Sequence, residues 1–421
     1  MAIEFAGSPK PTIGVEIELQ IIDPETRDLT TQSVKLLDMC HRRGIERVKA
    51  EITQSMIEID TEISQDVKEC RGYLERRIAQ LRTVTRDMGV DLAVSGTHPF
   101  QRWTERKIFP NERYRYLLDK FQWLAPRLNV YGLHVHVGVR SGASAIAISN
   151  AAIRYLPHLL ALSASSPYWE GLDTGMHSCR AGVMQSFPIS GLPYYFPNWQ
   201  EFERYCDTLL HTGAIASLKD LYWFIRPSPT YGTLEFRVCD GIPTLSETMA
   251  LVALVQALVV WIDEGFAGGG RSEAISMRRY WIAPENLWVA ARDGLEGMII
   301  VNEEGKRRKI ADDILNLLEH LAPVAKRLNS YEELLSLEQI IRNGSSARRQ
   351  RAVFGREQSL NAVVDCLVKE FAADSPLTPE AQETFQEVST RRRGISPLGP
   401  EQLSTFAERE LNRHPASSRY H

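Results

Sequence analysis

The chain has 421 residues, of which 43% are hydrophobic and 24% charged, so it can bury a large core in one domain or two. Its formal net charge of −4 argues against a polyanion-binding protein, and no nucleic-acid partner is expected. The six cysteines include no Cys-x-x-Cys pair, which disfavours a disulfide framework and a thiolate zinc site.

Membrane and export signals are weak in this sequence. Residues 1–10 lack the basic and then apolar layout of a signal peptide. The most apolar run, residues 249–260, is too short to span a bilayer. Scattered cysteines without pairing motifs fit reduced thiols. Together these features predict a cytoplasmic protein with no membrane partner.

The first predicted strand covers residues 13–21, where isoleucine, valine and leucine alternate with glycine, glutamate and glutamine. Glu16 and Glu18 therefore point to the same face, about 7 Å apart, and the opposite face is apolar. Two neighbouring carboxylates repel each other, and a proton, a cation or solvent must relieve the repulsion. Alone, such a pair is typical of a solvated strand face. Partners on other strands would indicate a site.

Helices and strands alternate along the rest of the chain. Helices are predicted at 33–43, 66–88, 114–124, 144–164, 202–211, 246–266, 285–293, 310–328 and 331–342. Further strands are predicted at 56–60, 90–96, 133–139 and 233–238, with a hairpin around Glu304 and Gly305. Asp66 should cap the second helix, Gly89 should end it, and Pro157 should bend the fourth. Residues 165–198 read as a long loop, a length that is uncommon unless the loop is functional.

Four predicted strands share one design: an apolar face, and a face whose side chains can bind a metal ion or phosphate. These side chains are Glu16 and Glu18, then Glu58, then His134 and His136, and finally Glu235 and Arg237. In one antiparallel sheet with helices on its apolar face, they would converge on the other face. Singly, a His-x-His is more often structural and a Glu-x-Arg is often a cross-strand ion pair. Together they indicate a site.

The residue types on this face narrow the chemistry. Carboxylates with one or two imidazoles suit Mg²⁺ or Mn²⁺ better than zinc. Arginines beside such an ion suit phosphate oxygens. The set therefore favours phosphoryl transfer from a metal-bound nucleotide. Since the sequence has neither a P-loop motif nor a G-x-G-x-x-G motif, another nucleotide fold is expected.

Several motifs resemble those of the carboxylate–amine ligase family, the second type of glutamate–cysteine ligase, whose fold is similar to glutamine synthetase. The motifs are Gly14-Val15-Glu16-Ile17-Glu18, Gly132-Leu133-His134-Val135-His136, Trp223-Phe224-Ile225-Arg226-Pro227, Gly232-Thr233-Leu234-Glu235-Phe236-Arg237, Glu285-Asn286-Leu287-Trp288-Val289-Ala290-Ala291-Arg292, and Asn343-Gly344 with Arg349-Gln350-Arg351-Ala352-Val353-Phe354. The resemblance covers roughly residues 11–370. It implies an α+β fold, a curved antiparallel sheet with helices packed on its apolar face, in a single ligase domain at 1–371. A polar, partly flexible C-terminal tail is expected at 372–421.

The resemblance also implies a reaction and roles for individual residues. The reaction is ATP-dependent formation of an amide or peptide bond through an acyl phosphate, with glutamate as the expected carboxylate and cysteine or another amino acid or amine as the second substrate. The implied ligands of two or three Mg²⁺ ions, with Mn²⁺ as an alternative, are Glu16, Glu18, Glu58, His134 and Glu235. Arg237 would contact the transferred phosphate, and Arg226 and Arg180 would hold the substrate carboxylate or the phosphorylated intermediate. Arg292 and Arg349 are placed on the nucleotide or substrate side. A homodimer is a family-level expectation.

One departure and two alternatives stay open at this point. Gln54 stands where many family members carry an acidic residue, which leaves the number of metal ions and the handling of the amine open. A metal-dependent amidohydrolase also uses His-x-His, but it needs further histidines and an aspartate on later strands. A relative that binds nucleotide without turnover is the other alternative. The intact set Glu16, Glu18, Glu58, His134, Glu235 and Arg237 argues against it.

Overall fold

The computed structural model describes residues 3–267 and 280–377, within one compact unit that runs to Leu377. Its centre is an antiparallel sheet with the strand order β10-β11-β5-β1-β3-β2, and β4 pairs with the end of β1. The strands of this sheet are β1 (Ile13–Ile22), β2 (Val48–Ala50), β3 (Met56–Asp60), β4 (Asp91–Ala93), β5 (Leu133–Gly138), β10 (Ile225–Ser228) and β11 (Thr233–Phe236). The predicted α+β class with an antiparallel sheet is confirmed.

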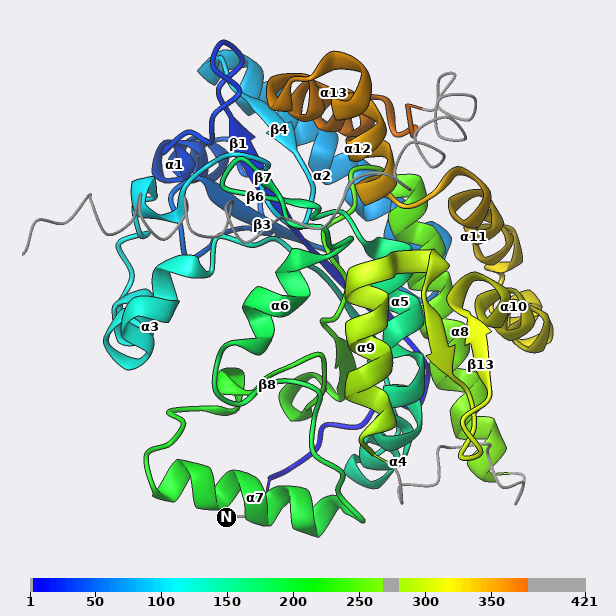
Figure 1. Cartoon of the computed structure of the whole chain (residues 1–421). Helices are drawn as coiled ribbons and strands as arrows, with labels where there is room; N and C mark the ends of the chain where they lie inside the picture. The colour runs from blue at the N-terminus through cyan, green and yellow to red at the C-terminus, as the bar shows by residue number, and fades with distance from the viewer. Residues whose placement is uncertain (1–2, 268–279, 378–421) are drawn as a thin grey trace, which may run out of the picture. The chain divides into compact units, whose positions relative to one another are not determined.

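One face of the sheet forms the main core. Ile13, Val15, Ile17, Leu19 and Ile21 alternate along β1, and all are buried. Helices α2 (Val67–Met88), α4 (Gly142–Ala152) and α8 (Leu245–Ala267) pack against this face (Figure 1). Since side chains on a strand alternate between its faces, this packing directs the polar residues of β1 to the other side.

The second helix ends where its sequence signals place it. The Asp66 side chain accepts a hydrogen bond from the backbone N–H of Glu69 and caps the first turn of α2. Gly89 follows the last turn with φ at 65°, a left-handed conformation that glycine adopts without steric cost. The predicted boundaries of this helix are confirmed.

Two helical stretches, Gly142–Ser163 and Leu245–Phe266, have the length and hydropathy of membrane spans. In each, 83% of the most apolar window is buried inside the protein. The apolar run at 249–260 lies within α8, which agrees with the helix predicted at 246–266. Its burial against the sheet and neighbouring helices accounts for its apolar residues, as in the core helices of soluble proteins.

Further helices surround this centre. They are α1 (Ser33–Arg42), α3 (Glu112–Phe121), α5 (Leu156–Ser163), α6 (Cys179–Gln185), α7 (Trp199–His211), α9 (Ile282–Asp293), α10 (Ile310–Arg327), α11 (Tyr331–Asn343), α12 (Ser346–Glu357) and α13 (Leu360–Ala373). Helices α10 and α11 pack on α8, α9 packs on α5, and α13 packs on β4. Three small sheets complete the described fold: β6 (Tyr168–Trp169) with β7 (Leu172–Asp173), β8 (Ser190–Gly191) with β9 (Tyr222–Trp223), and β12 (Met298–Ile300) with β13 (Arg307–Lys309).

Several sequence-based boundaries were wrong. The expected loop at 165–198 contains α6, which Ser178 caps by accepting a hydrogen bond from Ala181 N–H. The single bent helix at 144–164 is divided into α4 and α5, with Pro157 in the first turn of α5. The strand expected to reach Gly96 ends at Ala93, and Gly96 N–H donates to Ser165 Oγ instead of to a neighbouring strand. Helices α12 and α13 were not predicted.

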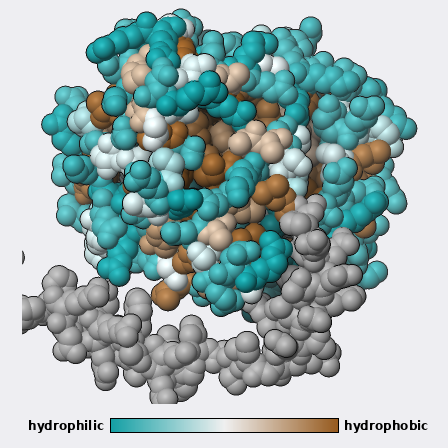
Figure 2. All heavy atoms as spheres, turned by 90° about the horizontal axis from the view of Figure 1, so that it is seen from above, coloured by the Kyte–Doolittle hydropathy of each residue, from teal (hydrophilic) through white to brown (hydrophobic). Residues whose placement is uncertain are grey.

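The surface and the cysteines agree with the composition. Figure 2 shows a face that hydrophilic residues largely cover, with hydrophobic residues gathered near its middle. All six cysteines are buried free thiols, as expected for a chain without a disulfide framework. The predicted division at 371–372 stays a prediction. Asp374, beyond that point, still accepts a hydrogen bond from Ser246 N–H, and residues from 378 lie outside the described part.

Candidate active site

Antiparallel pairing brings polar side chains from six strands into line on the face opposite the main core. Three cross-strand rows result: Arg226–Glu235–His136, His134–Glu16–Asp60 and Glu18–Glu58–Lys49. Directly opposite residues in such pairs have Cβ atoms about 5 Å apart, close enough for their side chains to share one ion. The register of the sheet therefore brings these side chains together in one site.

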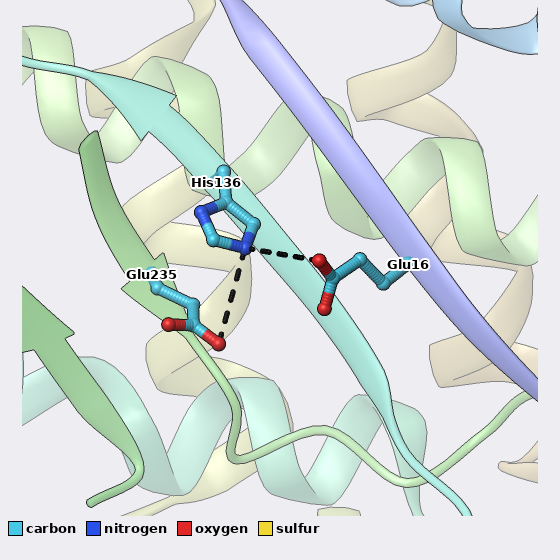
Figure 3. Close-up of side chains that lie close together, drawn as sticks. All are labelled: Glu16, His136 and Glu235. Carbon is cyan, nitrogen blue, oxygen red and sulfur yellow. Dashed lines mark ion pairs between the residues drawn. The ribbon is translucent and has the colours of Figure 1, made fainter. Parts of the chain in front are cut away.

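The first group that can bind a metal ion consists of Glu16, His136 and Glu235, from β1, β5 and β11 (Figure 3). His136 Nε2 lies 3.7 Å from Glu16 Oε1 and 3.9 Å from Glu235 Oε1. Its other ring nitrogen, Nδ1, hydrogen-bonds Thr233 Oγ1 at 3.0 Å. Nε2 is buried without a hydrogen-bond partner. A buried, unpartnered imidazole nitrogen between two carboxylates is a suitable ligand atom for a metal ion.

A second group joins Glu16 to His134 and Glu58, with ligand atoms within 4.8 Å of one another. The His134 ring donates from Nδ1 to Glu16 Oε2 at 3.1 Å. Although burial opposes the ionisation of Glu16, this hydrogen bond and the charges of His136 and His134 lower its pKa to about 2. Glu16 is therefore an anion at neutral pH and belongs to both groups.

A third group, Glu18, Glu51 and Glu58, contains only carboxylates within the same 4.8 Å. Burial and repulsion by Glu18 raise the pKa of Glu51 to about 8. Burial and repulsion by Glu16 and Glu51 likewise raise the pKa of Glu58 well above its usual range. Carboxylates that resist ionisation together have the electrostatics of a divalent-cation site, because a cation offsets their mutual repulsion.

Sequence reasoning overlooked Glu51 and did not assign His136 as a ligand. Glu51 precedes the turn at Ile52–Ser55, so the alternation of β3 does not reach it. The amide of Gln54 donates instead to the carbonyl oxygen of Ile108 at 3.0 Å. The acidic group that appeared to be missing at Gln54 is thus available from Glu51. The signal for His136 was present, since it shares the face of His134.

Two arginines flank this face, both held by Glu235. Arg226 donates from Nε to Glu235 Oε2 at 2.8 Å and from Nη1 to the carbonyl oxygen of Leu221 at 2.9 Å. Arg237 forms an ion pair with the same carboxylate. Although Glu235 is buried, the charges of the two arginines hold its pKa well below the usual range. Because Glu235 also lies beside His136, it connects the first metal-capable group to the two cations.

Arg180 lies beside the site but is turned into the protein. It is 3% exposed and donates to the backbone carbonyls of Val238 and Arg237, each at 3.3 Å. A Cβ atom on Gly132 would collide with the Arg180 guanidinium and approach His134 Nε2. Only glycine leaves room for this close approach at position 132. The predicted contact between Arg180 and a substrate carboxylate stays a prediction.

Arg349 and Arg292 occupy different surroundings from the other predicted arginines. Buried Arg349 donates to Glu247 of α8, to Glu370 of α13 and to the carbonyl of Gly344, so all three of its nitrogens are engaged. Arg292 is exposed on α9 and pairs with Asp293. These contacts favour a structural role for Arg349, and the predicted contact of Arg292 or Arg349 with the nucleotide or substrate stays a prediction.

The positions of the other histidines disfavour a metal-dependent amidohydrolase. Within residues 3–267 and 280–377, His134 and His136 are the histidines that belong to metal-capable groups. His158 lies in α5 and pairs with Asp313 of α10, with His158 Nε2 2.9 Å from Asp313 Oδ2. His98 hydrogen-bonds the backbone carbonyl of Arg27. His98 and His158 therefore have partners of their own away from the metal-capable groups.

Comparison with known proteins decides the family. Residues 12–366 match glutamate-cysteine ligase family 2. The chain belongs to this family. Two relatives provisionally named glutamate–cysteine ligase 2 are 41% identical over 380 residues (Thermobifida fusca) and 40% identical over 382 residues (Frankia alni). The alignments cover 89% and 90% of this chain and 94% and 99% of the relatives.

Solved structures of low sequence identity share the fold. A Francisella tularensis glutamate–cysteine ligase in complex with AMP has a TM-score of 0.63 at 11% identity, over 97% of this chain and 99% of that one. A bifunctional glutathione synthetase from Pasteurella multocida has a TM-score of 0.61 at 15% identity, over 89% and 53%. As a member of glutamate-cysteine ligase family 2, the protein is an ATP-dependent carboxylate–amine ligase, an enzyme that forms a C–N bond.

Proposed function

We propose that this family member joins glutamate to cysteine, or to a related amine, in a reaction that needs ATP and Mg²⁺ and proceeds through an acyl phosphate. The observation that carries the proposal is the set of three overlapping metal-capable groups on one sheet face, with Arg226 and Arg237 at its side. A ligase that brings a carboxylate to a polyphosphate must offset the repulsion between two anions. This face provides metal-capable groups and two arginines, which can offset that repulsion.

The donor set fits divalent cations that prefer oxygen. Five carboxylates and two imidazoles would hold them: Glu16, Glu18, Glu51, Glu58, Glu235, His134 and His136. Bound Mg²⁺ would offset charge on the phosphate oxygens and orient them for transfer. Mn²⁺ accepts imidazole nitrogen more readily and should substitute. The first and second groups share Glu16, and the second and third share Glu58. This overlap favours two or three ions.

The arginines act on the anions that move during the reaction. Glu235 fixes Arg226 and Arg237 at one end. Arg226 also donates from Nη1 to the carbonyl oxygens of Lys219 and Leu221, so Arg237 is the better placed to direct its other N–H groups to the phosphoryl group that leaves ATP. The substrate carboxylate oxygen attacks that phosphorus, ADP departs, and an acyl phosphate remains. The amine then attacks the acyl carbon and loses a proton while inorganic phosphate leaves. Both arginines stabilise negative charge at each step.

Location and assembly follow from more general features. Free, buried thiols fit a reducing cytoplasm, where glutamate, cysteine and ATP are all available. A homodimer is proposed only on the strength of family membership.

The test is amine-dependent release of ADP. The protein should release ADP from ATP when it is incubated with Mg²⁺, glutamate and cysteine, and mass spectrometry should detect their condensation product. Omitting the amine or chelating the metal should suppress the product. A pool of other amino acids and amines, analysed in the same way, would identify a different second substrate. No ATP binding and no ADP from any pool would refute the ligase assignment.

A further inference from the structure

Lys49 contacts the metal-capable groups from the edge of the sheet. It lies in β2, directly opposite Glu58 of β3, which is in turn opposite Glu18 of β1. Its ammonium is 3.1 Å from Glu58 Oε1 and 2.5 Å from Asp60 Oδ2. Glu58 belongs to two of the three metal-capable groups. The Lys49 ammonium therefore binds an oxygen of a residue that would also bind a metal ion.

Exposure differs sharply across this ion pair. The Lys49 side chain is 49% exposed, whereas Glu58 is 9% and Asp60 is 13% exposed. The carboxylates are fixed in the sheet, while the ammonium stands at its edge on a flexible stem. A lysine ammonium is strongly hydrated and can return to water at little cost. A divalent ion at Glu58 would repel the ammonium in that position.

We propose that Lys49 is a tethered cation that occupies the Glu58 end of the site until a divalent cation displaces it. The inference rests on the proposed metal-dependent function. In the metal-free protein the ammonium contacts Glu58 and Asp60 and offsets negative charge at the end of the site that Glu58 shares with Glu18 and Glu51. Metal binding requires its release, so Lys49 weakens the intrinsic affinity of the Glu58 groups for metal. The lysine thereby sets the cation concentration at which the site fills.

Titration of the full-length, nucleotide-free protein with Mn²⁺ tests this role, with the EPR signal of free Mn²⁺ as the readout. Lys49→Gln should bind Mn²⁺ about fivefold more tightly than the wild type, the range expected for removing a half-exposed ion pair. Lys49→Arg keeps the charge and should bind as the wild type does. Arg47→Gln is the matched control, because Arg47 contacts Asp60 and Glu62 from the same hairpin.

A thermal readout separates this role from simple stabilisation. Without metal, Lys49→Gln should melt at a lower temperature than the wild type, and saturating Mn²⁺ should remove the difference. An equal deficit with and without Mn²⁺ would make Lys49 a structural residue only and would overturn the proposal. Unchanged or weaker Mn²⁺ affinity in Lys49→Gln would overturn it as well. If the wild type binds no Mn²⁺, the proposed metal site fails first, and the role of Lys49 fails with it.

Discussion

At the scale of single residues, the site depends most on Glu16. It contributes to two metal-capable groups, hydrogen-bonds His134 and has a pKa of about 2. Glu16→Gln retains the size of the side chain but removes the charge and one coordinating oxygen. Ligase activity should fall by at least about a hundredfold, as it does when a preorganised electrostatic contact is lost.

The ADP-release assay measures this loss, and Glu332→Gln serves as its control. Glu332 is an exposed carboxylate in the first turn of α11 and should tolerate the same change with little effect. Similar losses in the two variants would contradict the role given to Glu16.

Most residues of the candidate site could be found from the sequence. Alternation placed Glu16, Glu18, Glu58, His134 and Glu235 on polar faces, and the structure brings them together. Metal binding by them is still a prediction. Periodicity could not find Glu51, which reaches the group through the fold of a turn, nor could it orient His136, whose Nδ1 is fixed by Thr233 on the next strand.

At the scale of helices and strands, the packing of α12 and α13 depends on a buried ion cluster. Arg349 of α12 pairs with Glu247 of α8 and Glu370 of α13, and all three residues are at least nine-tenths buried. Arg349→Met would leave two carboxylates buried without a cation. The free energy of unfolding should fall by about 3–5 kcal/mol.

Chemical denaturation measures this loss, and Arg342→Met provides the comparison. Arg342 pairs with Glu338 on the exposed side of α11, where the loss should stay below about 1 kcal/mol. A small loss at Arg349, accompanied by a large rise in the KM for ATP, would instead favour the nucleotide role predicted from the sequence.

Elements with strong local signals were predictable, and those that depend on tertiary contacts were not. Asp66 and Gly89 lie directly at the two ends of helix α2, so both ends can be predicted from the local sequence. Helix α12 begins at Ser346 and contains the basic run at 348–351, and the partners that bury Arg349 lie about 100 and 20 residues away in the chain. Helix α6 is short, and the glycines and prolines in its neighbourhood are typical of loops, so the sequence did not predict it.

At the scale of the whole molecule, acid should destabilise the fold through buried neutral histidines. Burial lowers the pKa of His98 to about 3, well below the ordinary value of about 6.5. As the pH falls below 6.5, His98 therefore binds a proton in the unfolded chain but stays neutral in the folded protein. Between pH 7 and pH 5 this difference should lower the free energy of unfolding by about 2 kcal/mol.

Denaturation curves at the two pH values test the effect, with His98→Asn as the comparison. An asparagine can hydrogen-bond the backbone without a charge that titrates in this range. The loss between pH 7 and pH 5 should be smaller in the variant by about the same 2 kcal/mol. Equal losses of unfolding free energy in both proteins would show that His98 does not cause the destabilisation at low pH.

The pairing of β1 with β5 on one side and β3 on the other has a consequence for how this enzyme can change over evolution. Because side chains alternate with a period of two, one residue inserted or deleted between Ile13 and Glu18 would turn the following side chains to the opposite face. It would carry carboxylates into the core and isoleucines to the face that carries the metal-capable groups. The central strand can thus vary by replacement but not in length. A residue added outside the paired strands leaves the facing of these side chains unchanged, so length can vary more readily there.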